Sequence, residues 1–406
     1  MSDSVIPKSS NDSVFPKSNA EGSQSLPHKF GKYVLFDFLG RGGMAEIYLA
    51  RTTSDLGASR LVVVKQILPL YAGSERFAEM LIHEAKLAAE LSHANIVQVF
   101  DLGRQTDQLF IAMEYVEGFD LHRLLRRCSR EKVPLPLEFA LHIITCTLRG
   151  LDYAHRRTAV DGTSLELVHR DVSPSNILVS FDGEVKLCDF GIAHAQDAME
   201  ARTSVVQGKA CYMSPEHARG DAIDARADIF AIGIVFWELL SGRRLYSTRD
   251  GSKTALLDLA KEAVIAPPKS HGFAEEEMLY AIAMKALAFN PDDRYPTAAA
   301  MLRALEDYVA KTGQFASPLR FGDWLVERFG GEIVERRRSR ERAAAAFARG
   351  PLVTLTPIRE SIPDIPPPEP SGIAMLEPTV PRYLPLTITI IVALLAIIVF
   401  LLFWKH

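Results

Sequence analysis

One ordered run of side chains, between positions 169 and 191, limits what this chain can fold into more than any other feature. It contains His169-Arg170-Asp171, then Asn176, then Asp189-Phe190-Gly191. Asp171 supplies a carboxylate that can accept the proton of an alcohol, while an amide oxygen and a second carboxylate suit Mg²⁺ held on a nucleotide. Each residue alone would be uninformative, but this order at this spacing rarely arises by chance. The run therefore predicts a site for metal-assisted chemistry on a phosphate group.

A glycine-rich segment, 39–47, precedes this run and lies between two apolar, strand-like runs at 33–38 and 47–50. Glycines allow backbone N–H groups to approach phosphate oxygens because no Cβ stands in the way. A segment of this kind is also typical of an ordinary hairpin turn. Its place upstream of the metal-binding residues favours the phosphate-binding interpretation.

A lysine and a glutamate follow at positions where they could meet the phosphates. Lys65 lies in the β-branched run Leu61–Ile67. A lysine in such a run usually points to solvent, but after a glycine-rich segment it is expected to bind the α- and β-phosphates. Apolar spacing predicts a helix from about Ser74 to Leu91, with Glu84 in its middle. Glu84 could pair with Lys65, although most helix glutamates are simply solvated.

Taken together, these motifs resemble those of the eukaryotic-type Ser/Thr protein kinases, particularly their bacterial membrane-bound branch. The resemblance covers roughly residues 30–310, about two-thirds of the chain. It implies an α+β, bilobal protein-kinase fold with a small β-rich N-lobe and a larger helical C-lobe. It also implies that ATP binds between the lobes together with Mg²⁺, for which Mn²⁺ could substitute.

The resemblance assigns a role to each of these side chains. Asp171 would orient the substrate hydroxyl and accept its proton, while Asn176 and Asp189 would bind the metal. Lys65, paired with Glu84, would hold the phosphates. Val63 occupies a position where these kinases usually have a smaller alanine, which would tighten the adenine pocket slightly. The residues expected to contact the nucleotide are Leu39, Gly40, Arg41, Gly42, Gly43, Met44, Ala45, Ile47, Val63, Lys65, Met113, Glu114, Val116, Asp120 and Leu178.

Downstream residues match structural features of the same family. The segment 213–216 resembles the one that closes the activation loop, and Glu216 would pair with Arg294. The apolar stretch between Asp224 and Leu240 would be a buried central helix. Asp228, within that stretch, would brace the catalytic loop.

Two positions depart from the family pattern. Ser/Thr kinases usually carry a lysine two residues after the catalytic aspartate, where Ser173 stands in this chain. The family's Gly-Thr near the end of the activation loop is Gly208-Lys209 here. Lys209 could therefore restore the cation lost at position 173, because phosphoryl transfer depends on positioning and charge stabilisation. Alternatively, Lys209 is an ordinary surface loop residue.

The loop between Asp189 and Glu216 suggests regulation by phosphorylation. Thr203 and Ser204 are candidate acceptors within it. A phosphate adds close to two negative charges, which Arg170 could pair and thereby order the loop. The resemblance thus implies autophosphorylation, for which two copies of the chain could associate.

The net charge and the cysteines limit which cellular compartment and which binding partners are expected for this chain. The net charge of −4 gives no argument for nucleic-acid binding, and no nucleic-acid partner is expected. The four cysteines lack C-x-x-C spacing, so neither a zinc site nor a disulfide framework is indicated. These features favour a catalytic part in the reducing cytoplasm.

The chain divides into a kinase domain at 30–310 and flanking segments. Residues 1–29 are Ser- and Pro-rich and predict disorder. A helical, Arg-rich extension is expected at 311–350, followed by a linker at 351–383 whose 351–381 portion contains nine prolines. The uncharged segment 384–404 would span roughly 31 Å as a helix, enough to cross the bilayer core and contact membrane lipid. We therefore expect a single-pass, tail-anchored membrane protein with a cytoplasmic kinase domain.

An arginine cluster within the extension has two interpretations. It could be part of a solvated helix, or it could contact anionic lipid head groups. Its members are Arg336, Arg337, Arg338, Arg340 and Arg342.

The expected function is transfer of the γ-phosphoryl group of Mg-ATP to Ser/Thr hydroxyls of protein substrates, in intracellular signalling. The alternative is a membrane-anchored pseudokinase scaffold, for which only Ser173 argues. Tyrosine specificity is less favoured because the catalytic loop lacks the alanine- and arginine-rich form of tyrosine kinases, but it stays open. The substrates themselves are not encoded in any recognisable motif.

Overall fold

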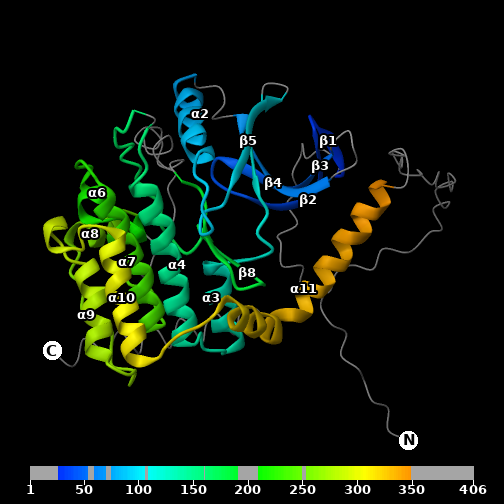
Figure 1. Cartoon of the computed structure of the whole chain (residues 1–406). Helices are drawn as coiled ribbons and strands as arrows, with labels where there is room; N and C mark the ends of the chain where they lie inside the picture. Colours follow the sequence, from blue (N-terminus) through cyan, green and yellow to red (C-terminus); the bar gives the residue numbers. More distant parts are fainter. Residues whose placement is uncertain are drawn as a thin grey trace, which may run out of the picture. The chain divides into compact units, whose positions relative to one another are not determined.

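The computed structural model describes residues 26–53, 59–69, 75–105, 108–159, 161–190, 209–248 and 253–348. The chain forms two compact units, 1–348 and 349–406, and the described residues all belong to the first. That unit has a β-rich N-lobe and a helical C-lobe, as the family resemblance implied (Figure 1). The predicted linker 351–383, the membrane segment 384–404 and most of segment 1–29 lie outside the described residues.

The N-lobe is a six-stranded antiparallel sheet with the strand order β1-β2-β3-β4-β6-β5. Its first strand begins two residues before the predicted domain boundary at 30. In the described part of the N-lobe, helix α2 (Glu75–Ala89) packs its apolar side against this sheet through Leu81 and Ala85. The strands are β1 (His28–Phe30), β2 (Tyr33–Arg41), β3 (Ala45–Thr53), β4 (Ser59–Ile67), β5 (Val99–Gln105) and β6 (Gln108–Glu114).

The register of the sheet determines which N-lobe side chains face the cleft between the lobes. β2 and β3 form a hairpin whose turn is the predicted glycine-rich segment, closed by a bond from Gly42 N to Ala45 O of 2.8 Å. Lys65 on β4 pairs with Ile47 on one side and Ile111 on the other. Alternate residues of a strand face opposite sides of the sheet, so Val63 and Lys65 share one face. That face looks into the cleft.

The C-lobe is built around α7 (Ala225–Ser241), which is buried along almost its whole length. A helix that is apolar on all sides belongs in a core, as the sequence predicted. A small sheet, β7 (Gly118–Asp120), β8 (Ile177–Ser180) and β9 (Val185–Leu187), covers the C-lobe below the cleft. The other elements are α3 (Leu121–Glu131), α4 (Leu137–His155), η1 (Lys209–Tyr212), α6 (Pro215–Arg219), α8 (Lys253–Glu262), α9 (Glu276–Ala286), η2 (Pro291–Asp293) and α10 (Ala298–Thr312).

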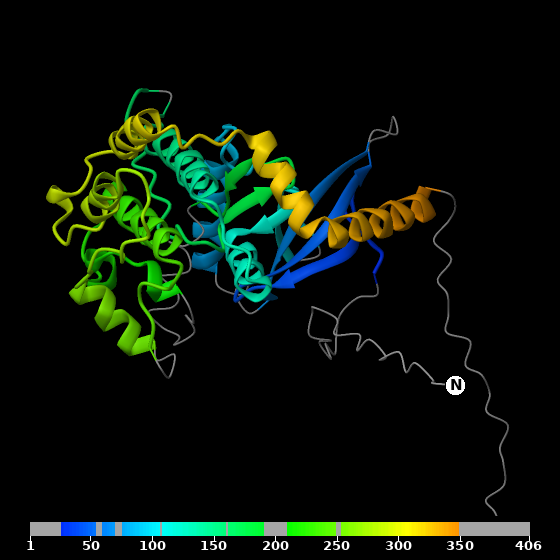
Figure 2. The ribbon, with the colours of Figure 1, turned by 90° about the horizontal axis from the view of Figure 1, so that it is seen from below.

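A long final helix, α11 (Pro318–Ala348), covers the segment for which the sequence predicted a helical extension. Its N-terminal end lies so close to the β8–β9 turn that only glycine, which has no Cβ, fits at positions 183 and 322. A Cβ on Gly183 would lie 1.8 Å from Pro318 O, and one on Gly322 would lie 2.6 Å from Phe181 O. From there α11 runs past α3 toward the N-lobe (Figure 2). Among the described residues, no helix has the length and apolar content needed to cross a bilayer.

The predicted ion pair between Glu216 and Arg294 is present and buried in the C-lobe. Arg294 Nη1 and Nη2 lie 2.7 and 2.8 Å from the two carboxylate oxygens, which is a bidentate arrangement. The Arg294 side chain is 0% exposed and also donates to the backbone carbonyls of Ala288, Phe289 and Arg226. Burial alone would raise the pKa of Glu216, but the hydrogen bonds from Arg294 lower it below its usual value.

We predict that Arg294→Ala lowers the free energy of unfolding by about 3–5 kcal/mol, because it leaves the buried Glu216 carboxylate without its counter-ion. Arg149→Ala is the matched control, since its ion pair with Glu306 is about half exposed on both sides. An exposed pair of this kind is worth at most about 1 kcal/mol. Urea denaturation followed by tryptophan fluorescence measures both variants. Similar losses in the two would contradict a structural role for the buried pair.

Candidate active site

The catalytic-loop residues predicted from the sequence are held in place by Asp228 of α7. Its Oδ2 accepts hydrogen bonds from His169 N at 2.7 Å and His155 Nε2 at 2.8 Å, and its Oδ1 accepts one from Arg170 N at 2.9 Å. Arg170 has a φ of +65°, a conformation that costs free energy for any residue with a side chain. The two backbone bonds to Asp228 stabilise this strained turn, and they present Asp171 at its end.

The Asp228 carboxylate stays ionised although it is almost fully buried. Burial raises its pKa, but hydrogen bonding and charge from His155 and the His169 N–H oppose burial and lower the pKa below its usual value. A charged acceptor makes stronger hydrogen bonds than a neutral one. Asp228 therefore holds the catalytic loop, as predicted, through charge-assisted hydrogen bonds.

The ring of His169 joins the catalytic loop to the segment that carries Asp189. Its Nε2 lies 2.9 Å from Cys188 O, and its Nδ1 lies 3.2 Å from Asp171 N. A carbonyl accepts and a backbone N–H donates, so the partners assign the neutral tautomer with the proton on Nε2. The ring also packs against Phe190, with 4.5 Å between ring centroids.

Asn176 lies directly beside the predicted proton acceptor. Its Nδ2 donates to Asp171 Oδ2 and to Asp171 O, both at 2.8 Å, and the backbone carbonyl of Asn176 accepts from Cys188 N at 2.9 Å. The two bonds from Nδ2 hold the side-chain amide of Asn176 through its nitrogen. The amide oxygen is the atom able to bind a cation. An amide oxygen plus the Asp189 carboxylate fits Mg²⁺, which usually takes one or two protein ligands together with phosphates and water. The residues present thus fit a metal carried on a nucleotide.

Lys65 and Asp189 form an ion pair across the cleft, 2.9 Å between Nζ and Oδ1. The Lys65 side chain is 9% exposed, and Asp189 adopts a φ of +65°. The expected partner of Lys65, Glu84, is buried on α2. Its pairing with Lys65 stays a prediction, while the contact with Asp189 was not foreseen.

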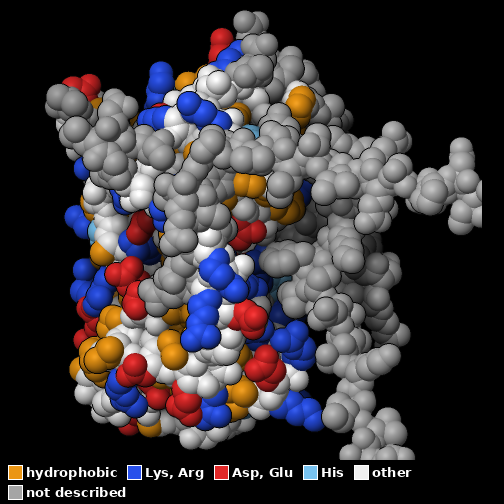
Figure 3. Space-filling model, turned by 90° about the vertical axis from the view of Figure 1, so that its right-hand side faces the viewer, with side chains coloured by type: hydrophobic (Ala, Val, Ile, Leu, Met, Phe, Trp, Pro, Cys, Tyr) orange, Lys and Arg blue, Asp and Glu red, His pale blue; other side chains and the backbone are white. Residues whose placement is uncertain are grey.

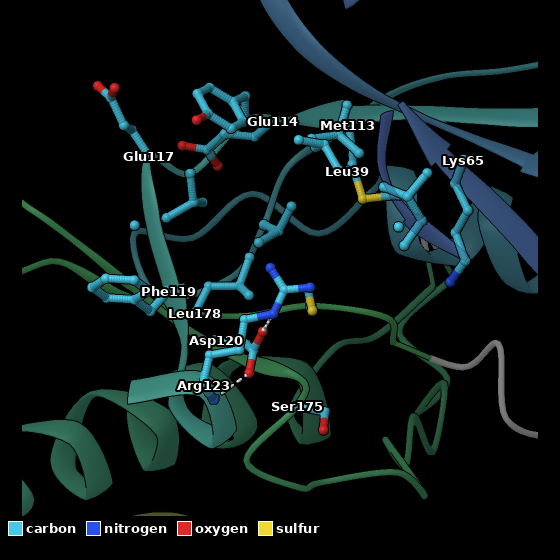
Figure 4. Close-up of a pocket in the computed structure, with 18 of the residues that line it drawn as sticks. Leu39, Lys65, Met113, Glu114, Glu117, Phe119, Asp120, Arg123, Ser175 and Leu178 are labelled. Atoms are coloured by element: carbon cyan, nitrogen blue, oxygen red, sulfur yellow. Dashed lines mark hydrogen bonds and ion pairs between the residues drawn. The ribbon is translucent and has the colours of Figure 1, made fainter. Parts of the chain in front are cut away.

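Most of the residues expected to contact the nucleotide line one cavity of about 330 Å³ between the lobes (Figure 4). Leu39 and Met113 lie on the N-lobe side of this cavity and Leu178 on the C-lobe side, which would place an adenine ring between them. The predicted residues found in its lining are Leu39, Gly40, Arg41, Gly42, Ile47, Val63, Lys65, Met113, Glu114, Val116, Asp120 and Leu178.

Three of the predicted nucleotide contacts do not line the cavity. Gly43 lies at the tip of the β2–β3 turn, while Met44 and Ala45 are buried in the N-lobe core beside Leu81 of α2. Met44, in the turn, and Ala45, the first residue of β3, are both buried in this core, so they support the glycine-rich turn from behind.

Asp120, one of the predicted nucleotide contacts, also caps the N-terminus of α3. Its Oδ1 accepts from Arg123 N at 2.8 Å, an N-cap bond, and its Oδ2 lies 3.1 Å from Arg123 Nε. Burial raises the pKa of Asp120, and the bonds from Arg123 oppose that rise. Asp120 is therefore fixed at the mouth of the cavity together with Arg123, which the sequence did not single out.

The lining includes three residues from α11 that the sequence analysis did not connect with this site: Ile333, Arg336 and Arg340. The arginine cluster was the available signal, but it was assigned to solvent or lipid. Thr203 and Ser204, the candidate phosphorylation sites, lie outside the described residues. The backbone of Lys209 begins η1, but its side chain is also outside the described part.

Comparison with known proteins agrees with this geometry. A family model described as the protein kinase domain matches residues 33–304. The chain is 42% identical over 321 residues to the tyrosine-protein kinase MasK of Myxococcus xanthus, a match that covers 78% of this chain and 49% of that protein. It is 36% identical over 281 residues to the serine/threonine-protein kinase PknB of Mycobacterium leprae, covering 68% of this chain and 42% of that protein.

Solved structures lead to the same family. The kinase domain of PknI from Mycobacterium tuberculosis is 28% identical, with a TM-score of 0.53, and the match covers 70% of this chain and 99% of that domain. The chain spans about half the length, or less, of the curated relatives that it matches. The catalytic loop, the metal-binding pair and the cleft are those of this family, and the chain belongs to the bacterial eukaryotic-type protein kinases.

Proposed function

We propose that this protein transfers the γ-phosphoryl group of Mg-ATP to serine or threonine hydroxyls of protein substrates. The observation that carries the proposal is the arrangement around Asp171. Its carboxylate is bonded to Asn176, and its backbone is tied to the segment that carries Asp189. Asp189 lines the cavity suited to a nucleotide, and Asn176 is hydrogen-bonded both to Asp171 and to the segment that carries Asp189, which supports the roles of these residues as Mg²⁺ ligands and proton acceptor.

Each side chain contributes a separate part of the transfer. Asp171 orients the acceptor hydroxyl and takes its proton as the new P–O bond forms. Asn176 and Asp189 hold Mg²⁺, which neutralises charge on the phosphates when it is bound. The ammonium of Lys65, next to Asp189, is placed to hold the phosphates. The chain thus carries the groups expected for such a reaction, except for the lysine that the family usually has at position 173.

The missing lysine at Ser173 favours one alternative, a pseudokinase that binds nucleotide without turnover. Ser173 is buried, and its backbone carbonyl accepts a hydrogen bond from Asn176 N at 3.0 Å. Ser173 therefore helps to hold the catalytic loop in its conformation. We propose that Lys209 supplies the absent cation, since a lysine stands at 209, where the family has threonine, in the same chain that lacks the lysine at 173.

We further propose that segment 384–404 anchors the protein in a membrane with the kinase domain in the cytoplasm. The support is the length and apolar character of that segment and the proline-rich linker before it. An anchored kinase is confined to two dimensions, which favours encounters between copies. Autophosphorylation of Thr203 or Ser204 between two copies fits this arrangement.

Asp171→Asn should lower the rate of phosphate transfer at saturating ATP by about 10²–10⁴-fold, the usual contribution of a positioned proton acceptor. Binding of Mg-ADP should persist, because the substitution leaves Asn176 and Asp189 in place. Incorporation of labelled phosphate into a generic Ser/Thr-containing protein measures the first effect, and calorimetry measures the second. Equal incorporation by wild type and variant would rule out catalysis at this site.

Lys209→Ala should reduce turnover at least tenfold if its ammonium stabilises the migrating phosphoryl group. The double variant Ser173→Lys with Lys209→Ala should recover part of the loss, because it returns a cation to the family position. Lys261→Ala serves as the control, since Lys261 is an exposed lysine on α8. Turnover of Lys209→Ala within a few-fold of wild type would end the compensation hypothesis.

The acceptor class is open to a direct test, since one relative carries the name of a tyrosine kinase. We expect phosphoserine and phosphothreonine after acid hydrolysis of labelled protein, because the catalytic loop lacks the alanine- and arginine-rich form of tyrosine kinases. Phosphoamino-acid analysis of the autophosphorylated chain and of a generic substrate, with Asp171→Asn as the blank, distinguishes the classes. Phosphotyrosine as the main product would contradict the proposed specificity.

A further inference from the structure

Helix α11 is built into the catalytic domain beyond the end of the family match at residue 304. Its first half is fixed to the C-lobe by aromatic packing. Phe321 is fully buried and stacks on Phe139 with ring centroids 4.8 Å apart, and Phe329 packs against Phe119 of β7. Because these rings lie in the same hydrophobic core as α4 and α7, this half of α11 cannot move independently of the C-lobe.

The second half of α11 reaches the N-lobe through Arg340. The Arg340 guanidinium lies over the ring of Tyr115, 5.2 Å from its centroid, and donates a hydrogen bond to the tyrosine hydroxyl. Its Nε is also 3.6 Å from Asp37 of β2. Only 16% of the Arg340 side chain is exposed. One guanidinium therefore contacts both the segment that connects the lobes and the strand that leads into the glycine-rich turn.

This contact lies at the opening of the nucleotide cavity. Ile333, Arg336 and Arg340 follow one another at three- and four-residue spacing, so they share one face of α11, and all three line the cavity. Arg336 is half-buried there, and burial together with Arg340 and Arg123 lowers its pKa. α11 thus adds an apolar and cationic side to a cavity whose other lining comes mainly from N-lobe strands, the segment between the lobes and residues of the C-lobe such as Leu178 and Asp189.

The remaining arginines of the cluster have other surroundings. Arg338 and Arg342 are exposed, and Arg342 Nε donates to Arg338 O at 3.1 Å. On the face of the molecule shown in Figure 3, Lys and Arg side chains alternate with Asp and Glu. At least Arg336 and Arg340 line the cavity of the catalytic domain, so neither predicted role, in solvent or on lipid, describes them.

We propose that α11 is a wall of the nucleotide site, and that Arg340 fixes this wall to Tyr115 and Asp37 so that bound nucleotide is retained. The proposal deepens the proposed function, on which it depends only for the binding of an adenine nucleotide in the cleft. Nucleotide release from a two-lobed enzyme needs the cleft to open. A helix anchored on the C-lobe and bonded to β2 resists that opening, so losing the bond should speed release and weaken affinity.

The test compares Arg340→Ala with Arg342→Ala in the full chain. The control removes an exposed arginine of the same helix that does not line the cavity. Isothermal titration calorimetry gives the dissociation constant for Mg-ADP, and initial rates give the KM for ATP and kcat separately. We expect Arg340→Ala to weaken Mg-ADP binding by about 2- to 30-fold, the range for loss of one guanidinium–aromatic contact. The KM for ATP should rise by a similar factor while kcat changes less, and Arg342→Ala should match wild type.

Two further variants separate a local effect from general damage. Asp37→Asn removes one charge from a half-exposed strand residue and should weaken Mg-ADP binding in the same direction. Arg340→Lys should lie between wild type and alanine, because lysine keeps the charge but not the planar group that covers Tyr115. A variant that loses kcat with an unchanged KM would point to a structural defect and overturn the proposal.

The outcomes also distinguish this proposal from the proposed function. Wild-type protein that binds Mg-ADP, with all three variants unchanged, would refute the wall and leave the kinase function standing. Tighter binding by Arg340→Ala would show that α11 obstructs the site, which is the opposite of retention. Wild-type protein that fails to bind Mg-ADP would overturn both.

Discussion

The geometry of the catalytic loop depends on the buried carboxylate of Asp228. A charge at the centre of the C-lobe is costly to bury, and it persists because three N–H groups point at it, two of them from the backbone of the loop. The same bonds stabilise Arg170 in a left-handed conformation. The desolvation of one side chain on α7 is thus offset by the interactions that give Asp171 a fixed position. The stability of the central helix and the chemistry of the loop cannot be separated.

From this point a continuous series of contacts leads to the N-lobe. His169 and Asn176 both bond to the backbone of Cys188, which precedes Asp189, and Asp189 pairs with Lys65 of β4. The proposed proton acceptor, metal ligands and phosphate-binding lysine therefore belong to one network, although they come from both lobes. Closure of the lobes and assembly of the site are the same event in such an arrangement. Within this network the ammonium of Lys65 and the carboxylate of Asp189 compensate each other's charge.

The sequence predicted most of this network because its parts are local. Asp171, Asn176 and Asp189 lie within one short stretch, and the β-branched run around Lys65 leaves little choice but a strand. The buried helix α7 follows from its apolar character alone. Met44 and Ala45 were assigned to the nucleotide because position in a motif does not show whether a side chain faces the cleft or the core, where both are buried. The contribution of Arg340 could not be predicted, since its partners Asp37 and Tyr115 are hundreds of residues away in the sequence.

The position of α11 changes what should count as the catalytic domain. The family match ends at residue 304, yet Phe321 and Leu325 are fully buried and belong to the same core as α4 and α7. Gly183 and Gly322 allow backbone contact between α11 and the β8–β9 turn, a fit that no larger residue permits. The match to MasK is 321 residues long, which is longer than the family segment 33–304, so the likeness to that relative extends beyond the common domain. A helix that completes the core at one end and contacts the cleft at the other couples the two physically.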